Sequence, residues 1–100
     1  MSYKDYVKHV KGDKKREVFL FTLSTCGWCK KTKTLLNNMG VDYKYVDMDL
    51  LPEKEQEEAR KALMKHNPDC SYPSMVIDNE DCIVGFQPEK YSEIFDDSQD

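Results

Sequence analysis

The fold of this chain is decided by one stretch, Val18-Phe19-Leu20-Phe21-Thr22-Leu23-Ser24-Thr25-Cys26-Gly27-Trp28-Cys29. Its apolar first half, with Arg16 before it, is typical of a central strand over residues 16–23. The helical spacing of the apolar residues that follow predicts a helix over residues 27–39, and Gly40 is a helix stop. Two cysteines three positions apart at a helix start can close a disulfide and open it again. The stretch therefore predicts a redox-active dithiol, Cys26 and Cys29, between a strand and a helix.

Cys26 is predicted to be the nucleophile of this dithiol. It stands at the expected start of the helix, where free backbone N–H groups and the positive end of the helix dipole favour a thiolate. Lys30, directly after the pair, adds a nearby cation. Cys29, one turn further inside, is the expected resolving thiol, which attacks the Cys26 sulfur of a mixed disulfide. Gly27 leaves room for a partner's backbone, and Trp28 is expected to be exposed beside the disulfide.

The other candidate metal ligands decide between redox chemistry and the alternative, a zinc site. A zinc ribbon needs a second close cysteine pair, but Cys70 and Cys82 are twelve residues apart. His9 and His66 have no partner at metal-ligand spacing, so we expect no metal and no cofactor besides the dithiol. A hairpin that pairs Ile77 with Cys82 would place Cys70 about 20 Å away, too far for a disulfide. A secondary redox role for Cys70 in its loop stays open.

Composition and charge set the class of protein. The chain has 100 residues, of which 39% are hydrophobic and 34% charged, and this fits a single globular domain over residues 1–100. No apolar run approaches the ~18 residues of a membrane span, and a net charge of -4 disfavours nucleic-acid binding. The N-terminus lacks the apolar core of a signal peptide, so we expect a cytoplasmic protein. In that compartment cysteine pairs tend to be catalytic rather than structural. We also expect it to be a monomer.

Hydrophobic periodicity and turn residues predict the element order β-α-β-α-β-β-α after an N-terminal extension, residues 1–15. The apolar spacing of the extension predicts either a short amphipathic helix over residues 3–10 or a frayed end. The first two strands flank a helical crossover and should be parallel, and the last two strands form a hairpin. The sequence thus predicts an α/β fold whose four-stranded mixed sheet has helices on both faces. The elements after the first helix are expected at residues 42–49 (strand), 52–66 (helix), 73–78 and 81–86 (strands), 88–96 (helix) and 97–100 (a mobile tail).

Three motifs in this order resemble the glutaredoxin-like branch of the thioredoxin superfamily, and the resemblance covers residues 18–95. They are Cys26-Gly27-Trp28-Cys29, Tyr72-Pro73 and Val84-Gly85-Phe86-Gln87-Pro88. The resemblance implies a thioredoxin-like (glutaredoxin) fold. It also implies that Pro73 is cis and faces the dithiol, and that Tyr72 presents its backbone to a substrate. Gly85 and Phe86 are implied to take part in partner binding.

The segment before the last helix distinguishes the branches of that family. Glutaredoxins that use glutathione usually carry Gly-Gly followed by Cys-Asp there, and a lysine just before the C-x-x-C. This chain has Gly85-Phe86-Gln87-Pro88 and Ser24-Thr25 instead. Gly-Phe-x-Pro is similar to the NrdH redoxins, which feed electrons to ribonucleotide reductase and are usually reduced by a flavin thioredoxin reductase.

The resemblance therefore implies a dithiol–disulfide oxidoreductase, an electron carrier that reduces protein disulfides, ribonucleotide reductase among them. A reductase of the thioredoxin-reductase type is the implied electron donor. Two alternatives remain: a glutathione-dependent glutaredoxin, and a binding module that carries an iron–sulfur cluster.

Overall fold

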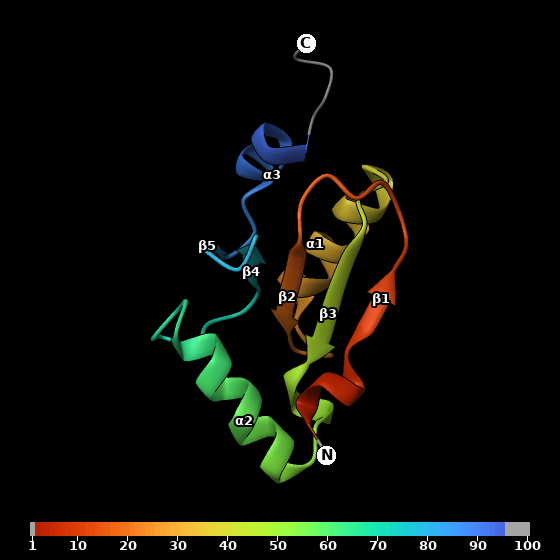
Figure 1. Ribbon diagram of the computed structural model, residues 1–100. Coiled ribbons are helices and arrows are strands. Elements are labelled where there is room, and N and C mark those ends of the chain that lie inside the picture. The colour runs from red at the N-terminus through yellow and green to blue at the C-terminus, as the bar shows by residue number, and fades with distance from the viewer. Residues whose placement is uncertain (1, 96–100) are drawn as a thin grey trace.

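A five-stranded mixed sheet forms the centre of the computed structural model, which describes residues 2–95 (Figure 1). Its strands are Lys8–Val10 (β1), Val18–Thr22 (β2), Tyr43–Asp47 (β3), Ser74–Ile77 (β4) and Asp81–Val84 (β5). Three α-helices flank it: Gly27–Asn38 (α1), Glu53–Met64 (α2) and Pro88–Phe95 (α3). Two short 3₁₀ turns complete the described chain, Tyr3–Tyr6 (η1) and Met48–Leu50 (η2).

The order of the strands in the sheet is β1-β3-β2-β4-β5, so the strand that leads to the dithiol is central. β2 pairs with β3 in parallel, as expected for strands joined by the crossover helix α1. β4 runs antiparallel to β2, and β5 runs antiparallel to β4. Because both neighbours of β2 are strands and both faces of the sheet are covered, four of its five residues are buried.

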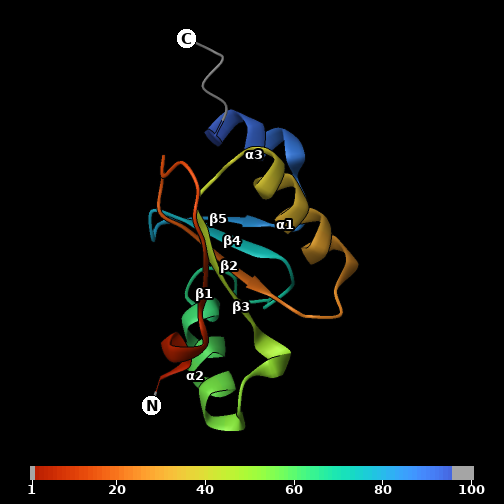
Figure 2. The same cartoon turned by 90° about the vertical axis from the view of Figure 1, so that its right-hand side faces the viewer.

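Helices cover both faces of the sheet, as the sequence predicted, and each face has its own apolar cluster. Figure 2 shows α1 and α3 together on one side, with α2 and the N-terminal turn at the lower end of the sheet. Alternation along each strand separates the clusters: Leu20 faces α1 and α3, whereas Phe21 faces α2. The helices add Leu36 and Tyr91 to the first cluster and Leu63 to the second.

The N-terminal extension differs from the expected helix over residues 3–10. Only Tyr3–Tyr6 is helical, and Lys8–Val10 forms β1, which pairs antiparallel with β3. The sequence predicted four strands, whereas the sheet has five, because β1 adds an edge strand next to β3. The apolar spacing of this segment fits a helix, but β3 otherwise leaves a row of unpaired backbone groups at the edge, and pairing them outweighs a short, marginal helix.

The extension is also fastened to the turn after α1. A Cβ atom at Gly12 would come within 2.6 Å of the Gly40 carbonyl oxygen, so only glycine allows this close approach. Next to it, the Asp13 N–H donates to the Gly40 carbonyl at 2.7 Å. The expected end of the last helix at Asp96 and the tail 97–100 lie outside the described residues.

The β4–β5 hairpin has a register one residue away from the prediction. Ile77 lies opposite Asp81, and Cys82 lies opposite Val76 rather than Ile77. The loop holds three residues because Asp78 and Asn79 both adopt positive φ angles, of 53° and 59°, before the chain returns. Among the described helices none is long and apolar enough to cross a membrane.

Candidate active site

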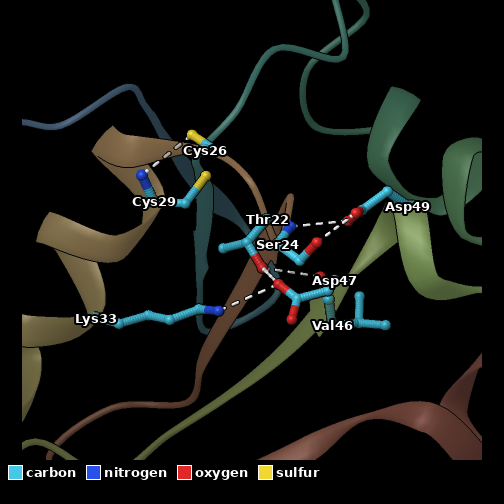
Figure 3. A network of polar contacts seen from close by, with 8 residues as sticks. All are labelled: Thr22, Ser24, Cys26, Cys29, Lys33, Val46, Asp47 and Asp49. Atoms are coloured by element: carbon cyan, nitrogen blue, oxygen red, sulfur yellow. Dashed lines mark hydrogen bonds and ion pairs between the residues drawn. The ribbon is translucent and has the colours of Figure 1, made fainter.

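The dithiol lies where β2 ends and α1 begins, as the sequence predicted. Cys26 is the N-cap of α1, and its Sγ accepts the backbone N–H of Cys29 at 3.1 Å (Figure 3). The preceding loop is closed by the Cys26 N–H, which donates to the Leu23 carbonyl at 3.2 Å. An otherwise unsatisfied N–H group of the helix start is thereby directed at the first sulfur.

The two thiols differ in their access to solvent. Cys26 is half-buried, whereas Cys29 is completely buried. Burial raises the pKa of the Cys29 thiol to about 12, and its hydrogen bond with Cys26 adds to that effect. The Lys33 ammonium acts in the opposite direction. A reagent in solvent can therefore reach Cys26, while Cys29 is a protonated thiol at rest.

An open pocket of about 240 Å³ lies beside the dithiol and is lined by residues of all three sequence motifs. Trp28 is 56% exposed, as predicted, and its ring centroid is 5.6 Å from that of Phe86. The other lining residues are Tyr72, Pro73 and Gly85. The wall is apolar and aromatic, which suits an extended polypeptide or another ligand with apolar groups.

Pro73 and Gly85 both line this pocket and are joined by a backbone hydrogen bond. The Tyr72–Pro73 peptide bond is cis, the geometry that the resemblance implied. The Gly85 N–H donates to the Pro73 carbonyl at 2.8 Å, and the Tyr91 hydroxyl donates to the Gly85 carbonyl at 2.8 Å. Gly85 has a φ of 83°, a left-handed conformation that favours glycine. Helix α3 thus supports the turn that follows β5.

The structure places the predicted lysine differently from the other site residues. Lys30 is exposed and does not line the pocket. Lys31 does not line the pocket either, but its Nζ atom is 4.6 Å from the centroid of the Trp28 ring, which does. A Cβ atom at Gly27 would meet nothing within 4 Å, so this side of the dithiol is open.

A polar network on the inner side of the dithiol was missed by the sequence analysis (Figure 3). Lys33 forms an ion pair with Asp47, and the Thr22 hydroxyl donates to the same carboxylate at 2.6 Å. Nearby, the hydroxyl and the backbone N–H of Ser24 both donate to Asp49, and they lower the pKa of its carboxyl group. One signal was present: Lys33 follows Cys29 by four residues, which places both on one face of α1.

Asn67 is a second residue whose role the sequence did not reveal. Its side chain is buried, and its Nδ2 donates to the hydroxyls of Ser71 and Ser74, each at 3.1 Å. The Ser74 hydroxyl in turn donates to the Ser71 carbonyl at 2.7 Å. These bonds hold the loop that carries Tyr72 and Pro73, where the sequence predicted only a turn.

Cys70 and Cys82 lie outside the pocket. Both are half-buried free thiols that pack against the apolar cluster under α2. Burial raises the pKa of Cys82, which makes it a poor nucleophile. Within residues 2–95, no group of three or more histidine, cysteine or acidic residues could hold a metal ion.

Replacing Cys70 and Cys82 together with serine is expected to change the rate of disulfide reduction by less than about twofold. Neither thiol lines the pocket, and a hydroxyl at the packed position of Cys82 costs about 1–3 kcal/mol of stability. Insulin-disulfide reduction and thermal unfolding measure the two effects. A large loss of turnover in a variant that unfolds at the wild-type temperature would assign one of these thiols to the reaction.

Comparison with known proteins agrees with the geometry of the site. A family model described as Glutaredoxin matches residues 18–82. The glutaredoxin of Methanosarcina mazei Go1 is 43% identical, with a TM-score of 0.83 over 92% of this chain and 89% of that one. Methanoredoxin of Methanosarcina acetivorans is 41% identical, with a TM-score of 0.82 over 85% and 90% of the two chains.

A curated relative gives the same result. An uncharacterized glutaredoxin-like 8.6 kDa protein in the rubredoxin operon of Clostridium pasteurianum is 33% identical over 67 residues, 67% of this chain and 81% of that protein. With the dithiol at the start of α1, these matches confirm the predicted thioredoxin-like fold. The chain belongs to the glutaredoxin family and is a glutaredoxin-like thiol redox protein.

Proposed function

We propose that this protein is a dithiol–disulfide oxidoreductase that reduces protein disulfides through Cys26 and Cys29. The observation that carries the proposal is the asymmetry of the pair: an accessible thiol at the helix start, beside an open pocket, and a fully buried thiol one turn inside. Reduction of insulin disulfides with a dithiol as donor tests the activity itself. We place this carrier in the cytoplasm, where such pairs are kept reduced and tend to be catalytic.

The reaction consists of two successive thiol–disulfide exchanges. Cys26 attacks a substrate disulfide, forms a mixed disulfide and releases the first substrate thiolate. Cys29 then attacks the Cys26 sulfur, so that the Cys26–Cys29 disulfide forms and the second substrate thiolate leaves. The N–H of Cys29, 3.1 Å from the Cys26 sulfur, stabilises negative charge there whenever Cys26 is a thiolate.

Pocket shape favours a polypeptide substrate. Trp28 and Phe86 supply an aromatic wall, and neither cis Pro73 nor Gly85 places a bulky polar side chain between the wall and the sulfur. An extended segment on either side of a substrate cysteine can lie along this surface. We include ribonucleotide reductase among the substrates, because Gly85-Phe86-Gln87-Pro88 matches the motif of redoxins that serve it.

The electron donor is expected to be a flavin reductase of the thioredoxin-reductase type rather than glutathione. The residues lining the pocket carry no charge, whereas a glutathione carboxylate is bound best by charge-assisted hydrogen bonds of about 1.5–3 kcal/mol each. Losing one such bond weakens binding about tenfold or more. We therefore expect glutathione with glutathione reductase to reduce the oxidised protein at least about tenfold more slowly at equal thiol supply. Steady-state reduction by each donor system measures this.

Lys31 and Gln87 are the groups that could replace the missing contacts. Gln87 donates its side-chain N–H to the Val84 carbonyl at 2.6 Å and is already engaged, while Lys31 lies over Trp28 at the pocket rim. Lys31→Met therefore serves as the diagnostic variant in the donor assay. Glutathione that matches the flavin reductase, and loses that rate in Lys31→Met, would make this chain a glutathione-dependent glutaredoxin.

A further inference from the structure

An ion pair lies in a largely solvent-excluded position on the inner side of the dithiol. The Nζ atom of Lys33 is 3.1 Å from Oδ1 of Asp47, and the two side chains are 20% and 13% exposed. The same carboxylate oxygen accepts the Thr22 hydroxyl at 2.6 Å. The Lys33 ammonium also lies 3.9 Å from the centroid of the Tyr45 ring. Asp47 and Tyr45 from β3 thus hold this ammonium in one place, and Thr22 from β2 holds the Asp47 carboxylate.

Stability alone does not account for such a pair. Removing two charges from water costs about as much as their attraction returns, so an apolar pair of similar size would serve the fold equally well. Its position indicates another role. Lys33 and Cys29 are four residues apart on the same face of α1, and Figure 3 shows both side chains directed toward the end of β2.

Cys29 is a buried thiol on which the Lys33 ammonium acts. It is fully buried, so forming its thiolate is costly, and resolution of a mixed disulfide requires that thiolate. The titratable groups that face it are Cys26 and Lys33 from α1, Tyr72 from the loop before β4, and Tyr91 from α3. Lys33 is the cation among these described neighbours.

We propose that Lys33, held by Asp47 and Thr22, is a positioning residue for the resolving step, where its ammonium stabilises the thiolate that Cys29 must form. This inference rests on the proposed dithiol mechanism. In the step, the Cys29 sulfur bonds to the Cys26 sulfur, the bond between Cys26 and the substrate sulfur breaks, and the electron pair leaves with the substrate thiolate. The proton lost by Cys29 is taken up by that thiolate, so no further oxidant or reductant is needed.

Lys33→Met tests this role, because methionine keeps an unbranched apolar stem and removes only the charge. The protein used carries Cys70→Ser and Cys82→Ser, so that only the dithiol reacts. A disulfide reagent that releases one coloured thiolate in each exchange separates attack by Cys26 from resolution by Cys29 in a rapid-mixing experiment. We expect the second phase to slow and its pH profile to move to higher pH, since loss of the cation raises the pKa of Cys29. The first phase should change by less than about twofold.

Two matched variants control for packing and net charge. Lys33→Arg keeps the cation and should restore most of the second phase. Lys44→Met removes a charge from an exposed position on β3 and should change neither phase. Titration of the Cys29 thiol by its ultraviolet absorbance, in a Cys26→Ser background, reads the same charge effect without turnover.

The outcomes distinguish the role of Lys33 from the dithiol function itself. A protein that releases no second thiolate at all overturns the proposed dithiol function. Two phases that are both unchanged in Lys33→Met, or equally slowed, overturn the role of Lys33 while the dithiol function stands. An unshifted Cys29 titration in the Cys26→Ser, Lys33→Met protein does the same, even where the variant is less stable.

Discussion

Cys26→Ser is expected to abolish insulin-disulfide reduction, whereas Cys29→Ser is expected to accumulate a stable mixed disulfide. The first substitution removes the half-exposed thiol that a substrate can reach. The second leaves that thiol in place and removes the buried one that completes the reaction. Mass spectrometry of each variant after incubation with a disulfide substrate identifies the adduct, and a turnover assay gives the loss of rate.

The double variant Cys70→Ser, Cys82→Ser is the matched control for this experiment, since it removes two thiols that do not line the pocket. It should form no stable adduct and should keep its turnover. An adduct on Cys26→Ser, together with none on Cys29→Ser, would reverse the roles assigned to the two thiols.

Leu36→Ala is expected to destabilise the protein by about 2–5 kcal/mol, the usual cost of removing a fully buried leucine side chain. Leu36 is completely buried between α1 and the sheet, in the cluster that also contains Leu20 and Tyr91. The truncation leaves a cavity beneath the helix that carries the dithiol. Urea unfolding followed by circular dichroism measures the free energy of unfolding, and the variant should still reduce disulfides while it remains folded.

Leu50→Ala makes the same chemical change at a position that is 63% exposed. Its expected effect is within about 0.5 kcal/mol, because surface substitutions rarely cost more. Equal destabilisation by the two leucine variants would contradict the assignment of the core. Loss of activity in folded Leu36→Ala would show that the geometry of the dithiol depends on packing behind α1.

Local signals in the sequence were sufficient for the dithiol and its setting. The apolar run over residues 18–22, the helix that follows it and the N-cap position of Cys26 are all governed by residues close together in the chain. Short-range periodicity and capping preferences therefore predicted them well. The motif around Tyr72 and Pro73 identified the opposite wall of the pocket through its resemblance to a family rather than through its own periodicity.

The tertiary structure decided the features that depend on distant partners. Residues Lys8–Val10 became a strand because β3 offers them an open edge, and Cys82 moved opposite Val76 because a three-residue loop closes the hairpin. Neither the free edge nor the length of the loop is encoded in local apolar spacing.

The polar side chains that support the site also depend on partners elsewhere in the chain. Asp47 lies fourteen residues from Lys33, and Asn67 reaches Ser74 seven residues away. From the sequence, Lys33 was one of several lysines close to the cysteines, without a known partner, and Asn67 was a residue in a turn. Whether a charged or polar side chain is exposed or buried beside a reactive thiol is settled only when β2, β3 and α1 pack together, since burial, not residue type, determines how strongly such groups act on one another. The sequence by itself therefore determined where the dithiol lies, and the tertiary structure decided which residues surround and support it.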